Sequence, residues 1–285
     1  MPAGQVAARD PAAATADYAV GPQYDTTHVY VAPGDVDRFV ASLIATFGGT
    51  ATTKGAFQVT PTTSKTFSQL VLTPAGSISV FGFTTPVPFP FGDERNGYLV
   101  TDLDAAVHSA VKAGATRRIS IFPDPIGRDA VVQWPGGVNM QLYWHTKAPN
   151  YPALATVPEN RVYLTPDSAD AFVRSWTNFA RGRVVSDNRS ADGGEIGQPG
   201  KIYRLIRITA RYGKTTVMVS DNHLTWPYGR ETTGYEVSNL RVTLAKASAA
   251  GVETLVAPHA EQGRQSAIVR FPGGYIAEIH SAVAP

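Results

Sequence analysis

Several residue types and patterns are missing from this chain, and each absence narrows its function. The 285 residues include no cysteine, which excludes disulfides, cysteine zinc sites and thiol nucleophiles. A chain that needs no disulfides fits the cytoplasm, and we predict that location. No apolar run approaches the roughly 18 residues of a membrane span, so we expect no membrane partner.

A strong charge of either sign is also missing. The chain has 25 Lys and Arg against 23 Asp and Glu, a net charge of +2 spread along its length, which predicts no nucleic-acid partner. There is no Gly-x-Ser-x-Gly elbow, no Walker loop, no His-Glu-x-x-His and no Gly-x-Gly-x-x-Gly helix entry. We therefore predict no nucleotide cofactor.

The most informative stretch that is present occurs twice. Residues 134–143 and 271–280 each contain an aromatic residue, a Pro-Gly-Gly turn and an alternating strand, with Gln141 in the first copy and Glu278 in the second. The copies lie 137 residues apart, and Gly97-Tyr98 matches Gly234-Tyr235 at the same offset. Matches at one constant offset indicate a tandem duplication.

The opening strands of the two halves match at a slightly different offset. Residues 28–33 and 161–166 are similar at an offset of 133. The change from 133 to 137 places a net insertion of four residues in the polar stretch 186–200, which we interpret as a loop. The length allows two domains, each with its own core.

Periodicity predicts an α+β fold. Residues 34–47 have the apolar spacing of an amphipathic helix, and Asp102 is a plausible N-cap for a second helix that ends at Gly114. Alternation predicts strands at 27–33, 56–60, 68–73, 77–83, 97–100, 118–122, 129–134 and 138–145. Each half therefore contains two β-α-β-β type units.

Domain boundaries follow from composition. Residues 1–24 are rich in Ala, Gly and Pro and lack the pattern of a signal peptide, so we predict a flexible arm that packs on the first domain. Domain 1 is expected at 25–147 and domain 2 at 160–285. The proline-rich stretch 148–159 is expected to link them.

This organisation resembles the vicinal-oxygen-chelate superfamily, which includes glyoxalase I, extradiol dioxygenases, and fosfomycin and bleomycin resistance proteins. The opening strands at His28 and Arg161, the helix entries after Tyr98 and Tyr235, and the repeated Pro-Gly-Gly stretches carry the resemblance. It implies two tandem glyoxalase-like domains, each of paired βαβββ units that form an open, cup-shaped mixed sheet. The superfamily hosts isomerases, lyases, dioxygenases and simple binders, so the resemblance specifies fold more closely than function.

The resemblance also implies where a divalent metal (Fe, Mn, Ni, Zn or Co) would bind. In the first cup the ligand positions are His28 and Gln141, with Arg95 at the opening of the second unit. One imidazole and one neutral amide beside a guanidinium make a poor cation site. In the second cup, Arg161 and Glu278 are predicted to form a structural ion pair in place of a lost metal.

Strand alternation selects the first cup as the working site. Asn139, Gln141, Tyr143 and His145 share one face of their strand, and His28 and Tyr30 share a face of theirs. We predict His28, Tyr30 and Tyr143 as catalytic residues. Arg95, Asn139, Gln141 and His145 are predicted to bind a small oxygen-rich or aromatic ligand.

Three functions stay open. The first is a metal-dependent lyase, isomerase or extradiol-type dioxygenase, with the dioxygenase least favoured because Arg161 stands at a ligand position. The second is a metal-free protein that binds a drug or metabolite. The third is a structural or partner-binding duplicate, in which both cups are filled by side chains. The resemblance leans towards an enzyme, the incomplete ligand set leans towards a binder, and a homodimer is a further option.

Overall fold

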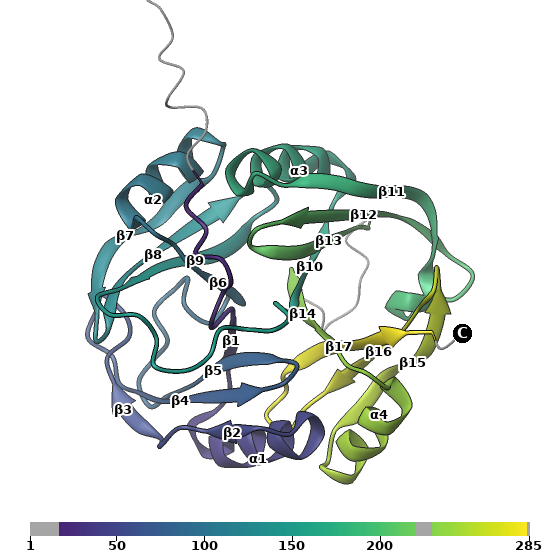
Figure 1. Cartoon of the computed structure of the whole chain (residues 1–285), viewed down its shortest axis with the longest axis horizontal. Helices are drawn as coiled ribbons and strands as arrows, with labels where there is room; N and C mark the ends of the chain where they lie inside the picture. Colours follow the sequence, from purple (N-terminus) through teal and green to yellow (C-terminus); the bar gives the residue numbers. More distant parts are fainter. Residues whose placement is uncertain (1–16, 221–229, 284–285) are drawn as a thin grey trace, which may run out of the picture.

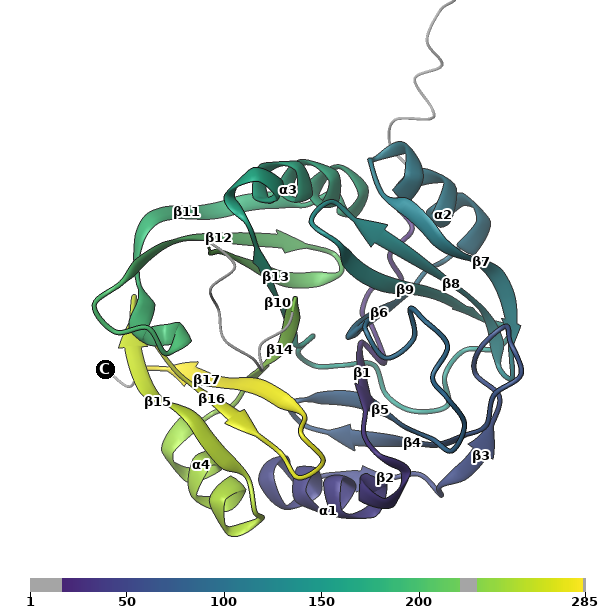
Figure 2. The same cartoon turned by 180° about the vertical axis from the view of Figure 1, so that it is seen from behind.

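Two large mixed sheets, one from each half of the chain, lie side by side in the molecule (Figures 1 and 2). The computed structural model describes residues 17–220 and 230–283. Both sheets curl, as Figure 1 shows on its left and right sides, so each has a concave inner face and an outer face that carries helices.

The first sheet has nine strands in two units. The first unit contains β1 (Thr27–Tyr30), α1 (Val36–Phe47), β2 (Thr50–Ala51), β3 (Gly55–Phe57), β4 (Thr66–Thr73) and β5 (Gly76–Phe83). The second contains β6 (Asn96–Leu99), α2 (Leu103–Lys112), β7 (Thr116–Asp124), β8 (Gly127–Trp134) and β9 (Val138–His145). Their order is β2-β4-β5-β1-β6-β9-β8-β7, with β3 paired to β4, so β1 and β6 join the units.

The second sheet repeats this topology. It contains β10 (Glu159–Leu164), α3 (Pro166–Ala180), β11 (Arg183–Asp192), β12 (Ile202–Ala210) and β13 (Gly213–Val219), followed by β14 (Glu231–Glu236), α4 (Leu240–Ala249), β15 (Glu253–Glu261), β16 (Arg264–Arg270) and β17 (Ile276–Ala282). The order β11-β12-β13-β10-β14-β17-β16-β15 matches that of the first sheet. The predicted fold class, two tandem glyoxalase-like α+β domains, is confirmed.

Local signals explain the helices. The apolar face of α1 is buried, and the chain leaves this helix at Gly48, which has a positive φ of 79°. The predicted cap of α2 is present, because the side chain of Asp102 accepts a hydrogen bond from the Ala105 amide at 3.0 Å.

The prediction of a loop at residues 186–200 is wrong. Most of it is the end of β11, a ten-residue strand, and the 3-10 helix η3 (Gly193–Ile196). β11 forms the exposed edge of its sheet, where polar side chains remain in water, so it lacks the alternation that reveals a half-buried strand.

The expectation of one core per domain is also wrong. In both views α2 lies beside α3 and α1 beside α4 (Figures 1 and 2). The two largest apolar clusters therefore combine residues of both halves, while two smaller ones lie within a single half. Trp134 from the first half and Trp176 from the second are both buried, with ring centroids 5.5 Å apart.

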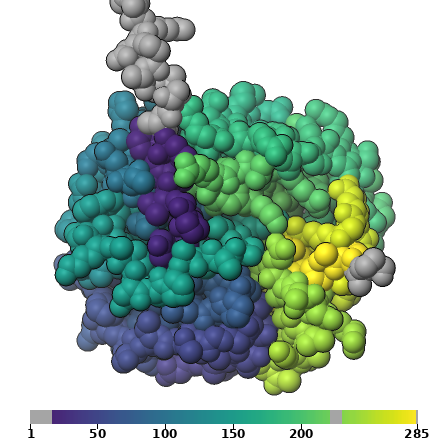
Figure 3. Space-filling view, in the orientation of Figure 1, coloured from purple at the N-terminus to yellow at the C-terminus, as the bar shows by residue number. Residues whose placement is uncertain are grey.

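The described part of the N-terminal arm lies against the first sheet, as the purple segment in Figure 3 shows. Ala19 bridges to Val100, and the Val20 amide donates to the Leu99 carbonyl at 3.2 Å. Asp17 forms an ion pair with Arg211 of the second half at 2.8 Å. The first 16 residues of the predicted arm lie outside the described residues. Within the described ranges, no helix has the length and apolar character needed to cross a membrane.

Candidate functional site

Arg161 and Glu278 lie together in the second cup, where the resemblance implies a metal. The register places Arg161 opposite Thr232, and it pairs Gly234 with Glu278 of the neighbouring strand. Arg161 and Glu278 are 0% and 1% exposed, and the guanidinium lies 3.8 Å from the carboxylate.

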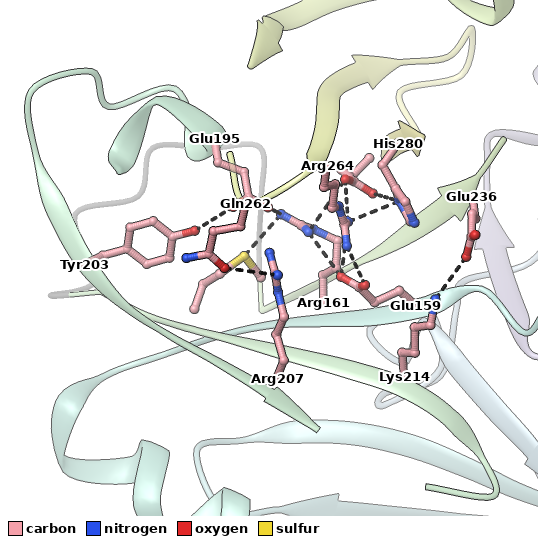
Figure 4. A network of polar contacts seen from close by, with 12 residues as sticks. Glu159, Arg161, Glu195, Tyr203, Arg207, Lys214, Glu236, Gln262, Arg264 and His280 are labelled. Atoms are coloured by element: carbon pink, nitrogen blue, oxygen red, sulfur yellow. Dashed lines mark hydrogen bonds and ion pairs between the residues drawn. The ribbon is translucent and has the colours of Figure 1, made fainter. Parts of the chain in front are cut away.

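A larger charge network surrounds this contact (Figure 4). Arg161 donates to Glu159 at 3.2 Å and to Glu195 at 3.1 Å. Arg264, at the start of β16, donates to Glu159 at 2.8 Å and to Glu278 at 2.6 Å. Two guanidinium groups thus share three carboxylates. A buried carboxylate costs least when it is paired and hydrogen-bonded in this way.

Two further side chains complete the network. Nδ1 of His280 lies 2.8 Å from the Glu278 carboxylate, and the Tyr203 hydroxyl donates to Glu195 at 3.0 Å. Burial alone would raise the pKa of Glu278, but Arg161 and Arg264 reverse this effect and hold the pKa below its ordinary value. These groups do not fit a bound metal, because the carboxylates are already paired and a guanidinium stands at the first ligand position.

Only part of this network is predictable from the sequence. Glu159 lies two residues before Arg161 on one strand, so alternation could have placed both on the same face. Glu195 lies in η3, inside the stretch interpreted as a loop, and Arg264 opens β16. Neither has a local pattern that points towards Arg161.

The first cup is different, because it holds a cavity of about 200 Å³. Five predicted site residues line it: His28, Tyr30, Gln141, Tyr143 and His145. The walls also include residues that were not predicted: Asp25, Phe57, Val59, Ser68, Ser79, Phe81, Phe91, Asp124, Pro125, Ile126 and Asp129. Phe57 and Ile126 are also 45% and 58% exposed, so they mark the mouth of the cavity.

Hydrogen bonds fix several polar groups of this wall. The hydroxyl of Ser79 donates to Oδ2 of Asp25, and the hydroxyl of Tyr143 donates to the Asp25 carbonyl. The hydroxyl of Tyr30 donates to Glu94, which is completely buried beneath the cavity lining. The polar wall is therefore held in position before any ligand binds.

Burial determines the charge state of these groups. It raises the pKa of Asp25 to about 7 and that of Glu94 to about 8, and it raises the pKa of Asp129 well above its ordinary value. Burial, assisted by Arg95, lowers the pKa of His28 to about 4, so this imidazole is neutral near pH 7. Burial also lowers the pKa of His145.

Two predicted ligand-binding residues lie outside the cavity lining. Arg95 packs behind Tyr30, with its guanidinium carbon 5.7 Å from the ring centroid, and it donates to the Gly92 carbonyl. Asn139 is buried and donates to Asp93 at 2.7 Å. Strand alternation located the cup but could not show that local partners hold these two side chains away from the cavity.

The predicted metal ligands of the first cup are His28 and Gln141. Nδ1 of His28 has no hydrogen-bond partner among the described residues and lies 4.0 Å from Glu94. In the described ranges, no group of three or more His, Asp or Glu side chains is arranged to hold a metal ion. Two neutral donors are a poor fit for a divalent cation, so the metal role of this pair stays a prediction.

Equivalent glycines make room for the central side chain of each cup. A Cβ added to Gly97 would lie 2.8 Å from Cε1 and 2.9 Å from Nε2 of His28. A Cβ added to Gly234, its counterpart in the second half, would lie 2.7 Å from Oε2 of Glu278 and 3.1 Å from Cδ of Arg161. The repeated Gly-Tyr dipeptide therefore reflects close packing in both cups.

No protein-family model matches the sequence, and no curated protein matches it. Solved structures with similar folds exist. A mutant of 4-hydroxymandelate synthase from Streptomyces coelicolor superposes with a TM-score of 0.63 over 92% of this chain and 93% of its own, at 12% identity. The 2,3-dioxygenase LapB from Pseudomonas sp. KL28 superposes with a TM-score of 0.57 over 95% of each chain, at 11% identity.

A third similar structure is a fusion of a xylose isomerase-like TIM barrel with a 4-hydroxyphenylpyruvate dioxygenase. It matches 94% of this chain and 50% of its own, with a TM-score of 0.57 and 14% identity. Identities this low establish the fold alone. Together with the repeated sheet topology, the three superpositions show that this chain has the fold of the tandem, two-domain members of the vicinal-oxygen-chelate superfamily.

Proposed function

We propose that the protein binds a single-ring aromatic molecule in the first cup and that this binding needs no metal. The contrast between the two cups carries the proposal. Side chains fill the second cup with a closed charge network, whereas the first retains a cavity of about 200 Å³. A dry cavity of about 150 Å³ is large enough for benzene, so the first cup has room for one ring with a short substituent.

The chemistry of the wall supports this ligand class. Phe57, Phe81 and Phe91 offer apolar and aromatic surface, and Phe81 packs against Tyr30 with ring centroids 5.3 Å apart. Polar atoms of His28 and Asp25 lack partners among the described residues, so they can bind a substituent of the ligand's ring. An apolar cavity with a few fixed polar groups is the usual form of a small-molecule site.

A second candidate is an enzyme of the lyase or isomerase type that works in the same cup. His28 favours it, because a neutral imidazole with a free Nδ1 can accept a proton from a bound molecule. The similar structures carry the names of enzymes: a 4-hydroxymandelate synthase, a 4-hydroxyphenylpyruvate dioxygenase fusion and a 2,3-dioxygenase. The dioxygenase alternative has least support, since Arg161 and its carboxylates are a poor match for a metal site.

A thermal-shift and calorimetric experiment with benzyl alcohol and phenol tests the proposal. Ser68 lines the cavity, and its neighbour Gln69 does not. We expect saturable binding to the wild type that is lost in Ser68→Trp, where the indole fills the cavity, and retained in Gln69→Trp. Equal binding to both variants would overturn the assignment to the first cup.

A separate experiment tests whether the first cup binds a metal. Fe, Mn, Ni, Zn and Co salts are added separately to protein that has been stripped with a chelator. The proposal predicts that none of them stabilises the protein in a way that depends on His28. Stabilisation by one metal in the wild type that disappears in His28→Ala would favour the second candidate instead.

A further inference from the structure

We propose that the ligand of the first cup carries a protonated amine, which Asp129 and Asp25 bind while the aromatic wall holds its ring. This inference deepens the proposed function and rests on it. It concerns the charge of the ligand, which the sequence pattern of the cup does not indicate.

Asp129 is the first observation behind it. It lies on β8 with only 6% of its surface exposed, and it lines the cavity. Among the described residues no hydrogen bond or cation stabilises its carboxylate, and burial together with the acids Asp124 and Glu94 raises its pKa. A buried carboxyl group without a partner is costly, so a ligand that supplies one gains binding free energy.

The second observation is the environment of Asp25, which belongs to a different part of the chain. It precedes β1, and only one of its carboxyl oxygens is satisfied, by Ser79. The other, Oδ1, is buried and makes no hydrogen bond of normal geometry to a described residue, although the Thr27 and Ser79 amides lie close enough to lower the pKa of this carboxyl group. Tyr143 connects the two acids, since it donates to the Asp25 carbonyl and stands opposite Asp129 in the β8–β9 register.

Among the described residues, the cavity lining supplies no cation that could neutralise these acids. No Lys or Arg belongs to the described lining, whereas Asp124 adds a third carboxyl group. Arg128, next to Asp129 on β8, is engaged elsewhere, because it pairs with Asp104 at 3.0 Å and packs over Trp144. Both lining histidines have lowered pKa values, so they do not supply the missing charge.

The aromatic wall favours the same ligand. Tyr30 and Phe81 stand beside His28, whose ring is 5.6 Å from that of Phe81. A desolvated ammonium near such ring faces gains cation–π attraction. A carboxylate in the same position would face three acids and the negative faces of the rings, so the cavity disfavours anions.

Proton release gives the binding step a signature of its own. In the empty cavity, burial raises the pKa of both Asp25 and Asp129, and Asp124 and Glu94 raise that of Asp129 further. An ammonium favours the ionised carboxylate and lowers both pKa values. We therefore expect amine binding near neutral pH to release protons and to strengthen as the pH rises towards about 8.

Calorimetry with three matched probes tests the inference: benzylamine, benzyl alcohol and benzoate. We expect benzylamine to bind at least about tenfold more tightly than benzyl alcohol, and benzoate to bind more weakly than either. Titrations in phosphate and in Tris, whose ionisation enthalpies differ, should report protons released with benzylamine and none with benzyl alcohol.

Substitutions test which residues cause the preference for the amine over the alcohol. Asp129→Asn should reduce the ratio of amine to alcohol affinity to about one, and Asp25→Asn should reduce it in part. Asp167→Asn removes the same charge from an exposed position at the start of α3, in the second half, and should leave the ratio unchanged. The buffer comparison uses only wild-type protein, so it decides the matter even if Asp129→Asn fails to fold.

The outcomes separate the two proposals. If benzyl alcohol binds in the cup as tightly as benzylamine and no protons are released, the amine inference is wrong while the proposed function stands. If none of the three probes binds to the wild type, both are wrong. Preferential binding of benzoate would overturn the amine inference alone.

Discussion

The guanidinium of Arg161 lies 3.8 Å from the carboxylate of Glu278, and neither side chain is exposed to solvent by more than 1%. In the first cup, the equivalent positions are His28 and Gln141, which line an open cavity. One duplicated framework thus has a closed cup and an open one. The charge of the residues at matching positions distinguishes them.

Replacement of Arg161 tests how much the closed cup contributes to stability. Arg161→Met keeps most of the side-chain volume but leaves Glu159 and Glu195 with fewer cationic partners. Loss of one partner from a buried ion pair costs about 3–5 kcal/mol, and we expect a loss of that size in the free energy of unfolding. Urea denaturation followed by circular dichroism measures it.

Lys214→Met is the matched control. Lys214 pairs with Glu236 at 3.0 Å, but both side chains are about half exposed, at 57% and 46%. Exposed pairs contribute about 1 kcal/mol or less, so this variant should unfold close to the wild type. Equal losses in the two variants would contradict a stabilising role for the buried network.

The paired glycines give a second prediction. Gly97→Ala places a methyl group against the buried ring of His28, and we expect a loss of about 1–3 kcal/mol from overpacking together with loss of ligand binding in the first cup. Thermal denaturation and calorimetry measure the two effects. In Gly34→Ala the new methyl group meets no atom within 4 Å, so stability and binding should both be retained.

Much of the fold could be predicted because its signals are local or repeated. The matching dipeptides at Gly97 and Gly234 indicated the duplication, and apolar spacing located α1. The sharing of cores could not be predicted, since the apolar face of a helix does not specify its partner. The contact between Trp134 and Trp176 depends on how the halves assemble.

The site was less predictable because buried acids have no distinctive local pattern. His28 and Tyr143 were found through strand alternation, and both line the cavity. Asp129 sits in a strand that its apolar neighbours identify, but the sequence does not show that its carboxyl group is unpartnered. Glu94 lies between a turn and β6, in a polar stretch where a charged residue is ordinarily exposed, and only the tertiary fold buries it.

The pH dependence of stability gives a third prediction. Burial raises the pKa of Glu94 from its ordinary 4.5 to about 8, so its stabilising contribution is complete below about pH 4.5 and is lost as the pH rises through about 8. Glu159 and Glu278 have lowered pKa values, so their contribution is lost as the pH falls below the ordinary range. Stability should therefore peak at mildly acidic pH.

Unfolding free energies at about pH 5.5 and about pH 9 test this dependence. We expect the wild type to be less stable at the higher pH and Glu94→Gln to lose less between the two, because an amide cannot ionise while its oxygen still accepts from Tyr30. Asp104→Asn, at an exposed position, should follow the wild type. A wild type that gains stability towards pH 9 would contradict the assignment.

The shared cores give the last prediction. Trp176 is 1% exposed and packs against Trp134 and Tyr98 of the other half, so Trp176→Ala opens a cavity between the halves. We expect the free energy of unfolding to fall by about 3–5 kcal/mol. Both halves should unfold in one transition, because neither half has a complete core of its own. Trp144→Ala is the control, since this residue is partly exposed beneath Arg128 and its replacement should cost less stability.

Circular dichroism and tryptophan fluorescence should give coincident unfolding curves for the wild type. Two separated transitions, or an isolated first half that folds with the stability of the whole chain, would show instead that each half keeps its own core.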